Sequence, residues 1–387
     1  MVSRGLTLPS GEPAKRVVIK LGSAQIADGG AVRTERLSAV ARDIAALKDA
    51  GADVLLVSSG AIALGRARLG LKAPTLRLEE KQAAAAIGQI ALMQAWSAAF
   101  EPHGAPVAQA LLTLDDTERR RRWLNARATL QTLIETGAVS IINENDTVAT
   151  EEIRYGDNDR LAARVAQMVA ADALILLTDV DGLYTADPRK DRTAKHIPRV
   201  EDITEAVTAM AGGSNRDSGV GSGGMKTKID AARIAVRAGC ACAVTLGGRD
   251  APILSLNAGA RATWFTPSVS PDTARRQWLG SHLKAQGAFI VDAGAARALA
   301  SGASLLPVGL SRVDGAFDRG DAVTVKAISG ALIGTGVSAY SSDDAKRIAG
   351  KKSREVEAVL GFQGRPALIH RDDFVHAETF NVQTATT

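Results

Sequence analysis

The chain has 387 residues with a formal net charge of +5, and 46% of them are hydrophobic, 23% charged and 4% aromatic. This length and composition predict an ordinary globular protein of two domains, or of one large and one small domain. The positive charge is spread along the chain and aromatic side chains are few, which argues against a concentrated nucleic-acid surface with base stacking.

The first two thirds of the chain alternate short apolar runs with helical stretches. Residues 1–16 lack the apolar segment of a signal peptide and are expected to form a short loose tail. The alternation that follows predicts an α/β domain over residues 17–265, with a mostly parallel open sheet sandwiched by helices. The expected strands are Val17–Leu21, Val54–Val57, Val107–Leu111, Val139–Ile142, Leu174–Leu177 and Ala243–Leu246.

Residues 82–100 form an uncharged stretch that is nearly long enough to span a membrane. Its glutamines and its many small residues make it only weakly apolar. We therefore expect a helix packed inside a soluble domain and no membrane partner. The two cysteines, Cys240 and Cys242, suit neither a disulfide framework nor a zinc site, and they indicate a reducing, cytoplasmic location.

The pattern changes after residue 265. Residues 266–284 contain prolines and charges and are interpreted as a linker. Residues 285–366 show strand-like runs separated by glycine turns, which predicts a small, mainly β domain. Residues 367–387 are expected to form a C-terminal tail.

Polar and charged side chains follow several predicted strands of the first domain. Ligands bind beyond the carboxyl ends of strands in open α/β sheets. Each cluster could instead have a purely structural role: a lysine can extend its ammonium group to solvent from a strand end, a serine can cap a helix, and an acidic run can form a turn. Their gathering at one edge nevertheless favours a ligand site. The clusters are Lys20, Ser59, Asn143 to Asp146, Asn158 with Asp159, and Thr178 with Asp179.

The stretch GVGSGGMKTK, residues 219–228, is rich in glycine and lysine. It resembles a P-loop but carries Met225 where that motif has its lysine, and polar residues precede it instead of a strand. Glycines before a helix make an anion site. The alternative is a flexible surface loop with two ordinary lysines, and the stretch alone leaves both open.

Lys20 and Lys228 together suit phosphoryl transfer. A moving phosphoryl group and an anionic acceptor repel each other by about 4 kcal/mol at about 4 Å and an effective dielectric constant near 20. Fixed cations offset this repulsion as charge spreads in the transition state. An ionised carboxylate acceptor would need no general base, in keeping with the lack of a hydroxyl–histidine–carboxylate pattern and of metal-ligand spacing among the five histidines.

The chain from Val17 to Asp373 resembles the amino-acid kinase fold, and within it the glutamate 5-kinases. Residues 285–366 resemble the PUA domain that many bacterial members carry. The blocks behind the resemblance are VVIKLGS, VLLVSSGAIALG, WLNAR, IINENDTVAT, YGDND, LLTDVDGLYTADP and GSGGMKTK, with GASLLPVGLSRVDG and FDRGDAV in the second domain.

The resemblance implies ATP-dependent phosphorylation of the γ-carboxylate of L-glutamate, which gives L-glutamyl 5-phosphate and ADP in the first step of proline biosynthesis. It implies Mg²⁺ carried mainly by the ATP phosphates, with no metal ligand named in the protein. It further implies feedback inhibition by proline, a homo-oligomer (dimer or tetramer), and coupling to glutamyl phosphate reductase.

Site residues carry over by motif position. Lys20, Lys228 and Asp159 would be catalytic, with Asp159 orienting the lysines. Ser59, Asp146 and Asn158 would bind glutamate, with Asp146 on its ammonium group. The ATP site would consist of Lys20, Thr178, Asp179, Ser222, Gly223, Gly224, Met225, Lys226, Thr227 and Lys228. Lys226 replaces a residue that is often small and polar, and no role is assigned to it.

Two rival interpretations remain. Acetylglutamate, aspartate and uridylate kinases share the sheet and the lysines, although the NEND and GDND blocks favour glutamate. An RNA-binding protein acting through the PUA domain is the other rival. The net charge of +2 over residues 276–387, from 13 Lys and Arg against 11 Asp and Glu, argues against strong RNA affinity.

Overall fold

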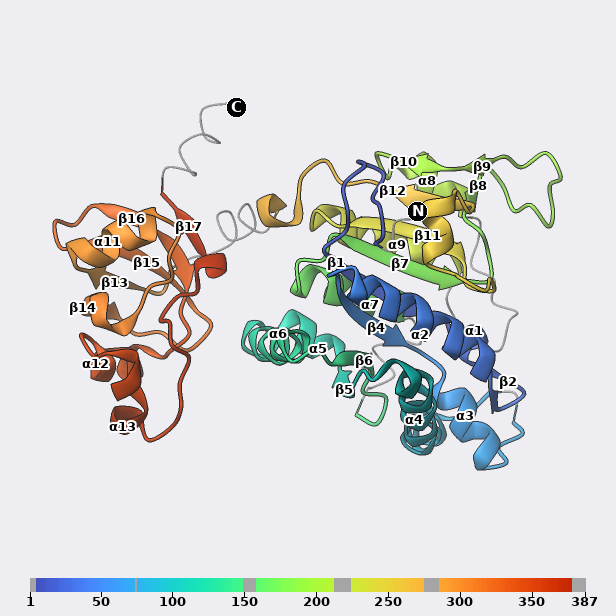
Figure 1. Cartoon of the computed structure of the whole chain (residues 1–387), viewed down its shortest axis with the longest axis horizontal. Helices are drawn as coiled ribbons and strands as arrows, with labels where there is room; N and C mark the ends of the chain where they lie inside the picture. Colours follow the sequence, from blue (N-terminus) through green and yellow to red (C-terminus); the bar gives the residue numbers. More distant parts are fainter. Residues whose placement is uncertain (1–4, 74, 149–157, 212–223, 275–284, 378–387) are drawn as a thin grey trace. The chain divides into compact units, whose positions relative to one another are not determined.

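The computed structural model describes residues 5–73, 75–148, 158–211, 224–274 and 285–377. The chain divides into two compact units, Met1–Asp272 and Thr273–Thr387, and Figure 1 colours them along the sequence. The core of the second unit is built from its own residues, between Phe289 and Phe374. The domain boundaries expected at residues 265 and 285 remain predictions.

A single large sheet forms the centre of the first unit. Its strands are β1 (Arg16–Leu21), β4 (Asp53–Ser58), β5 (Val107–Leu112), β6 (Val139–Glu144), β7 (Ala173–Thr178), β10 (Arg199–Val200), β11 (Ala241–Leu246) and β12 (Ala262–Phe265). They lie in the order β10-β12-β11-β7-β1-β4-β6-β5. From β11 to β5 every neighbouring pair is parallel, whereas β12 is antiparallel to β11. All six predicted runs are strands of this sheet, which confirms the expected architecture.

Two short hairpins extend from the first unit. They pair antiparallel strands of two residues each. Their strands are β2 (Ala27–Asp28) with β3 (Ala31–Val32), and β8 (Leu183–Tyr184) with β9 (His196–Ile197).

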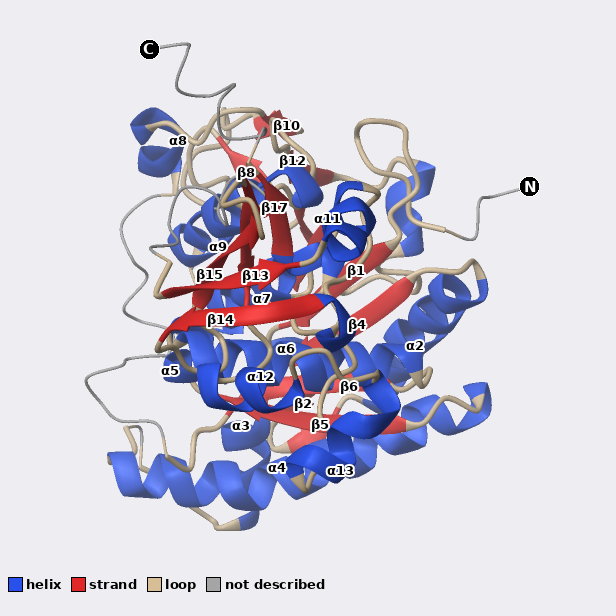
Figure 2. Cartoon of the chain, turned by 90° about the vertical axis from the view of Figure 1, so that its left-hand side faces the viewer, coloured by secondary structure: helices blue, strands red, loops and turns tan. Residues whose placement is uncertain are grey.

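The second unit is a small, mainly β domain (Figure 2). Its strands are β13 (Gly287–Val291), β14 (Leu310–Gly315), β15 (Ala322–Ala327), β16 (Leu332–Val337) and β17 (Phe374–His376), and its helices are α11 (Ala293–Ala300), α12 (Ser342–Ile348) and α13 (Val356–Leu360). The five strands lie in the order β14-β13-β15-β16-β17. All pairs are antiparallel except β13 with β15. The predicted small β domain is thereby confirmed.

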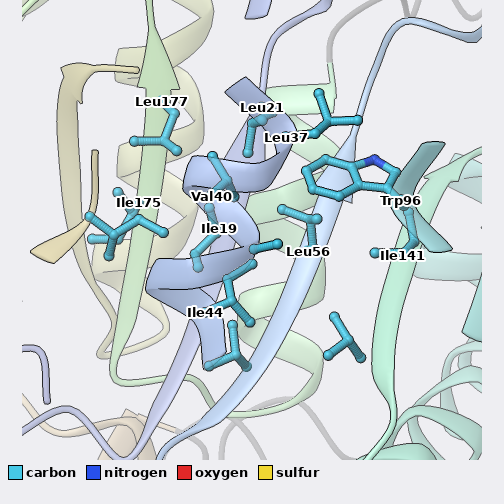
Figure 3. Packing of buried hydrophobic residues seen from close by; sticks show 14 of the residues in the cluster. Ile19, Leu21, Leu37, Val40, Ile44, Leu56, Trp96, Ile141, Ile175 and Leu177 are labelled. Atoms are coloured by element: carbon cyan, nitrogen blue, oxygen red, sulfur yellow. The ribbon is translucent and has the colours of Figure 1, made fainter. Parts of the chain in front are cut away.

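Helices cover both faces of the large sheet because successive residues of a strand point to opposite sides. The helices are α1 (Ser23–Ile26), α2 (Thr34–Asp49), α3 (Ala61–Arg68), α4 (Leu78–Phe100), α5 (Leu114–Glu118), α6 (Arg120–Glu135), α7 (Asn158–Met168), α8 (Glu205–Met210) and α9 (Met225–Arg237). Ile19 of β1 belongs to a core cluster with residues of α2, α3 and α4, and Figure 3 shows it beside Val40 and Ile44 of α2. The adjacent Val18 belongs to the opposite cluster, with residues of α6, α7 and α9.

The two expected tails are shorter than predicted. Leu6 is fully buried, and the backbone N–H of Thr7 donates to Oδ1 of Asn257 at 2.9 Å, so the chain is held against the fold at residues 6 and 7, whereas residues 10–13 are exposed. At the other end, β17 pairs with β16, and Leu368 is part of the core. Residues 367–377 therefore belong to the second unit, because their apolar side chains complete its core.

Helix α4 explains the apolar stretch at residues 82–100. Leu78–His103 is long and apolar enough to cross a membrane, and half of its most apolar window is buried inside the fold. Trp96 and Phe100 are fully buried in the core between α4 and the sheet. Burial of this kind is the behaviour of a core helix, as the sequence predicted.

Candidate active site

The parallel strands bring the predicted site residues to one edge of the sheet. Lys20 lies one residue before the end of β1, in register with Val57 of β4 and Leu176 of β7. Ser59 follows the end of β4, where Gly60 has φ +101°. That left-handed conformation favours glycine, and it turns the chain directly from β4 into α3.

Asp159 joins the two predicted catalytic lysines. Its Oδ1 lies 2.6 Å from Nζ of Lys20, and its Oδ2 lies 3.2 Å from Nζ of Lys228. The side chains of Asp159, Lys20 and Lys228 are 0%, 8% and 6% exposed, respectively. Buried charges are stable only when they are paired, and Asp159 pairs with both lysines. The carboxylate thus holds two ammonium groups close together at fixed positions, an arrangement that suits an anion.

Asn158, the neighbour of Asp159, forms a second cluster with two residues from other elements. Its Nδ2 donates to Oγ of Ser59 at 2.8 Å and to Oδ1 of Asn143 at 2.9 Å. All three residues are buried. Two adjacent residues at the start of α7 thus organise a cationic cluster and a neutral hydrogen-bonding cluster side by side.

The glycine-rich stretch leads directly into α9. Gly224 precedes the helix, and Met225, Lys226, Thr227 and Lys228 form its first turn. The Thr227 hydroxyl donates to Oδ2 of Asp159 at 3.2 Å, whereas Lys226 is exposed. The predicted loop residues Ser222 and Gly223 lie outside the described residues.

Thr178 and Asp179 follow β7 at the same edge. The Thr178 hydroxyl donates to Oδ1 of Asp179 at 2.9 Å. The backbone carbonyl of Thr178 accepts from the N–H of Gly247 at 2.8 Å, which ties the end of β7 to the chain after β11. The pair is thus held at the carboxyl end of the sheet, on the side of β1 opposite Ser59.

Asp146 lines a cavity of about 520 Å³ between α4 and the ends of β5 and β6. Burial raises the pKa of its carboxyl to about 6. Glu144 and Gln89 line the same cavity, and Oε1 of Gln89 accepts from Nδ2 of Asn143 at 2.9 Å. Through Asn143 the cavity adjoins the cluster of Asn158 and Ser59, so the three predicted glutamate-binding residues share one region.

Sequence reasoning did not assign roles to Asn143 and Gln89. Asn143 lies next to the last residue of β6. Its place in the polar run Asn143 to Asp146, at the end of a predicted strand, was the available signal. Gln89 carried no such signal, because it lies in the middle of an apolar helix, 54 residues before its partner. Among the described residues, no group of three His, Cys, Asp or Glu side chains is placed to hold a metal ion.

Comparison with known proteins agrees with this arrangement. Residues 15–245 match the Amino acid kinase family and residues 287–360 match the PUA domain. The glutamate 5-kinase of Paramagnetospirillum magneticum is 58% identical over 94% of this chain and 98% of its own. That of Caulobacter vibrioides is 57% identical over 95% and 97%. The chain therefore belongs to the amino acid kinase family, and within it to the glutamate 5-kinases.

Proposed function

We propose that this protein transfers the γ-phosphoryl group of ATP to the γ-carboxylate of L-glutamate in the cytosol, as a step of proline biosynthesis. The observation that carries the proposal is the buried cluster in which Asp159 holds both Lys20 and Lys228, directly beside the Asn158–Ser59 pair. It supplies cations for phosphate next to neutral donors and acceptors for an amino acid. The glutamate 5-kinases of similar sequence support the choice of substrate.

The acceptor would be held between the two clusters. Asp146 would pair with the substrate ammonium, and Ser59 and Asn158 would hold its carboxylate end near the lysines. A γ-carboxylate oxygen then attacks the γ-phosphorus of ATP, a new P–O bond forms, and the bond to the ADP oxygen breaks. The acceptor is ionised already, so no proton has to be removed.

The cations would act mainly in the transition state. As charge spreads over the phosphoryl oxygens, Lys20 and Lys228 stabilise it at fixed positions. Asp159 would position both ammonium groups. Thr178, Asp179 and the first turn of α9 with Gly224 would hold the nucleotide, whose phosphates would carry Mg²⁺; Ser222 and Gly223 remain predicted members of this site.

The test is an ADP-release assay with glutamate, acetylglutamate, aspartate and UMP offered in parallel. We expect ATP-dependent turnover with glutamate at least about a hundredfold above acetylglutamate and UMP, since a buried site built to pair with an ammonium group rejects acceptors that lack it. Aspartate has the ammonium group but is one methylene shorter, so its side-chain carboxylate should fall short of the lysines and turnover should drop at least about tenfold. Preferred turnover of acetylglutamate or UMP would reject glutamate as the substrate.

We also propose that proline inhibits the enzyme by overlapping the glutamate site, because proline shares the α-carboxylate and the α-nitrogen of glutamate. Increasing glutamate should then relieve inhibition in steady-state assays. Inhibition that persists at saturating glutamate would place proline elsewhere. Assembly into a dimer or tetramer and coupling to glutamyl phosphate reductase stay expectations of the family.

A further inference from the structure

Gln89 of α4 has a buried amide nitrogen at the wall of the Asp146 cavity. Its Nε2 is inaccessible to solvent and has no hydrogen-bond partner among the described residues. Leaving a buried N–H donor unpaired is unfavourable. The side chain also lines a cavity of about 520 Å³, so a molecule that enters the cavity and displaces the groups covering Nε2 can supply the missing acceptor.

The orientation of this amide is fixed by the backbone. The N–H of Glu144, which is always a donor, donates to Oδ1 of Asn143 at 2.9 Å. Asn143 must then turn its Nδ2 toward Gln89, which accepts through Oε1 at 2.9 Å. The remaining nitrogen of Gln89 is therefore a donor and not an oxygen assigned the wrong way round.

We propose that Nε2 of Gln89 donates a hydrogen bond to the α-carboxylate of the amino-acid substrate. The inference rests on the proposed function for the identity of that amino acid. Asp146 and Glu144 make part of the cavity wall acidic, which suits an ammonium group and repels a carboxylate. A fixed N–H donor in the same wall gives the carboxylate a place beside the ammonium.

The α-carboxylate is favoured over the γ-carboxylate by connectivity. The ammonium and the α-carboxylate are bonded to the same carbon, so a substrate whose ammonium pairs with Asp146 must place its α-carboxylate in the same cavity. The γ-carboxylate is needed at Lys20 and Lys228. Among the described residues, hydrogen bonds lead from Gln89 to Asn143 and from there to Asn158, the neighbour of Asp159.

Two substitutions separate a binding role from a supporting role. Gln89→Leu removes both the donor and the acceptor. Gln89→Glu keeps an oxygen for Asn143 but replaces the donor with a carboxylate oxygen that repels the substrate carboxylate. Gln363→Leu is the control, because it makes the same change at an exposed position of the second unit that does not line the cavity.

Glutamate binding to the full-length protein is measured by isothermal titration calorimetry. We expect Gln89→Leu to raise the Kd about tenfold to a hundredfold, which is the range for a hydrogen bond to a charged group. Gln89→Glu should raise it further, and Gln363→Leu should change it less than about threefold. If Gln89→Glu binds like the wild type while Gln89→Leu is weak, Gln89 only supports Asn143 and the proposal is wrong.

Two analogues locate the contact on the substrate. 4-Aminobutyrate lacks the α-carboxylate, and glutarate keeps both carboxylates but lacks the ammonium. Gln89→Leu should weaken glutarate as much as glutamate and leave 4-aminobutyrate nearly unchanged; equal weakening of all three would overturn the proposal. Turnover is scored separately: a wild type that binds glutamate in a Gln89-dependent way but releases no ADP would reject the proposed function alone.

Discussion

Lys20 and Lys228 reach one buried carboxylate from different elements, a strand end and the first turn of a helix. Removing either cation leaves Asp159 with one of its two lysines and takes away half of the charge that would stabilise the transferring phosphoryl group. We expect Lys20→Ala and Lys228→Ala each to lower kcat by at least about a hundredfold. Steady-state ADP release measures this, with circular dichroism to confirm folding and the exposed Lys81→Ala as control. A folded variant with near-normal kcat would show that the lysine has no catalytic role.

We expect glutamate binding to depend on pH through Asp146. Because burial raises its pKa to about 6, the carboxyl is ionised above this pH and protonated below it. Pairing with the ammonium needs the ionised form, so the KM for glutamate should rise about tenfold per pH unit below about pH 6, while the KM for ATP changes little. Asp146→Asn should bind glutamate weakly at every pH; an unchanged pH profile in this variant would assign the effect to another group.

The raised pKa of Asp146 also makes the stability of the folded protein depend on pH. The folded state binds the Asp146 proton more tightly than the unfolded state does. Its contribution to folding is therefore complete below about pH 4 and is lost as the pH rises through about 6. Folding thus favours the protonated form of Asp146, whereas the proposed binding of glutamate favours the ionised form. The ammonium group of bound glutamate would offset the cost of burying the ionised carboxylate.

Individual residues differ in how far the sequence could predict them. Asp159 was expected to orient two lysines, and the structure places it between them. The Asn143–Gln89 contact could not be foreseen, because it joins a strand end to a helix 54 residues away. A glutamine within an apolar helix gives no local sign of what it faces.

Helices α3 and α4 cross at two glycines. A Cβ added to Gly88 would lie 1.8 Å from the carbonyl oxygen of Ala61, and one added to Gly65 would lie 1.7 Å from that of Ala84. Backbone contacts this close leave no room for a methyl group. The crossing fixes the position of α4, and therefore of Gln89, which contacts Asn143 of β6.

We expect Gly88→Ala to destabilise the protein by about 1–3 kcal/mol, the usual cost of overpacking, and to raise the KM for glutamate by displacing Gln89. Differential scanning calorimetry and steady-state kinetics measure the two effects. Ser97→Ala, at an exposed position of the same helix, should change neither. An unchanged Tm in Gly88→Ala would mean that the crossing adjusts without cost.

At the scale of elements, apolar runs predicted six strands of the sheet because five of the runs are buried on both faces, the exception being the edge strand β5. Boundaries were predicted less well. Residues 225–228, which were predicted to belong to a phosphate loop, form the first turn of α9, since lysine and threonine are tolerated in a first helical turn. The C-terminal unit extends to β17, because Phe374 and Val375 bury apolar side chains that a short sequence window shows as isolated.

The whole molecule combines two units with separate cores. Every described residue assigned to the site lies before residue 230, within Met1–Asp272. The core of the second unit draws on residues from Phe289 to Phe374. Compact units of this kind are often separable, so the chemistry should depend on the first unit alone.

We therefore expect a chain ending at Ala274 to fold and to release ADP in the presence of glutamate, within about tenfold of the full-length rate. Its large sheet, both core clusters around that sheet and both lysines are retained. Proline sensitivity or the oligomeric state should change instead, which inhibition assays and light scattering measure. The matched control is the full-length protein with Leu332→Ser, an exposed site in the second unit. A truncated chain that shows the native circular dichroism spectrum but no activity would mean that the second unit completes the active site, and the division of labour between the units would have to be abandoned.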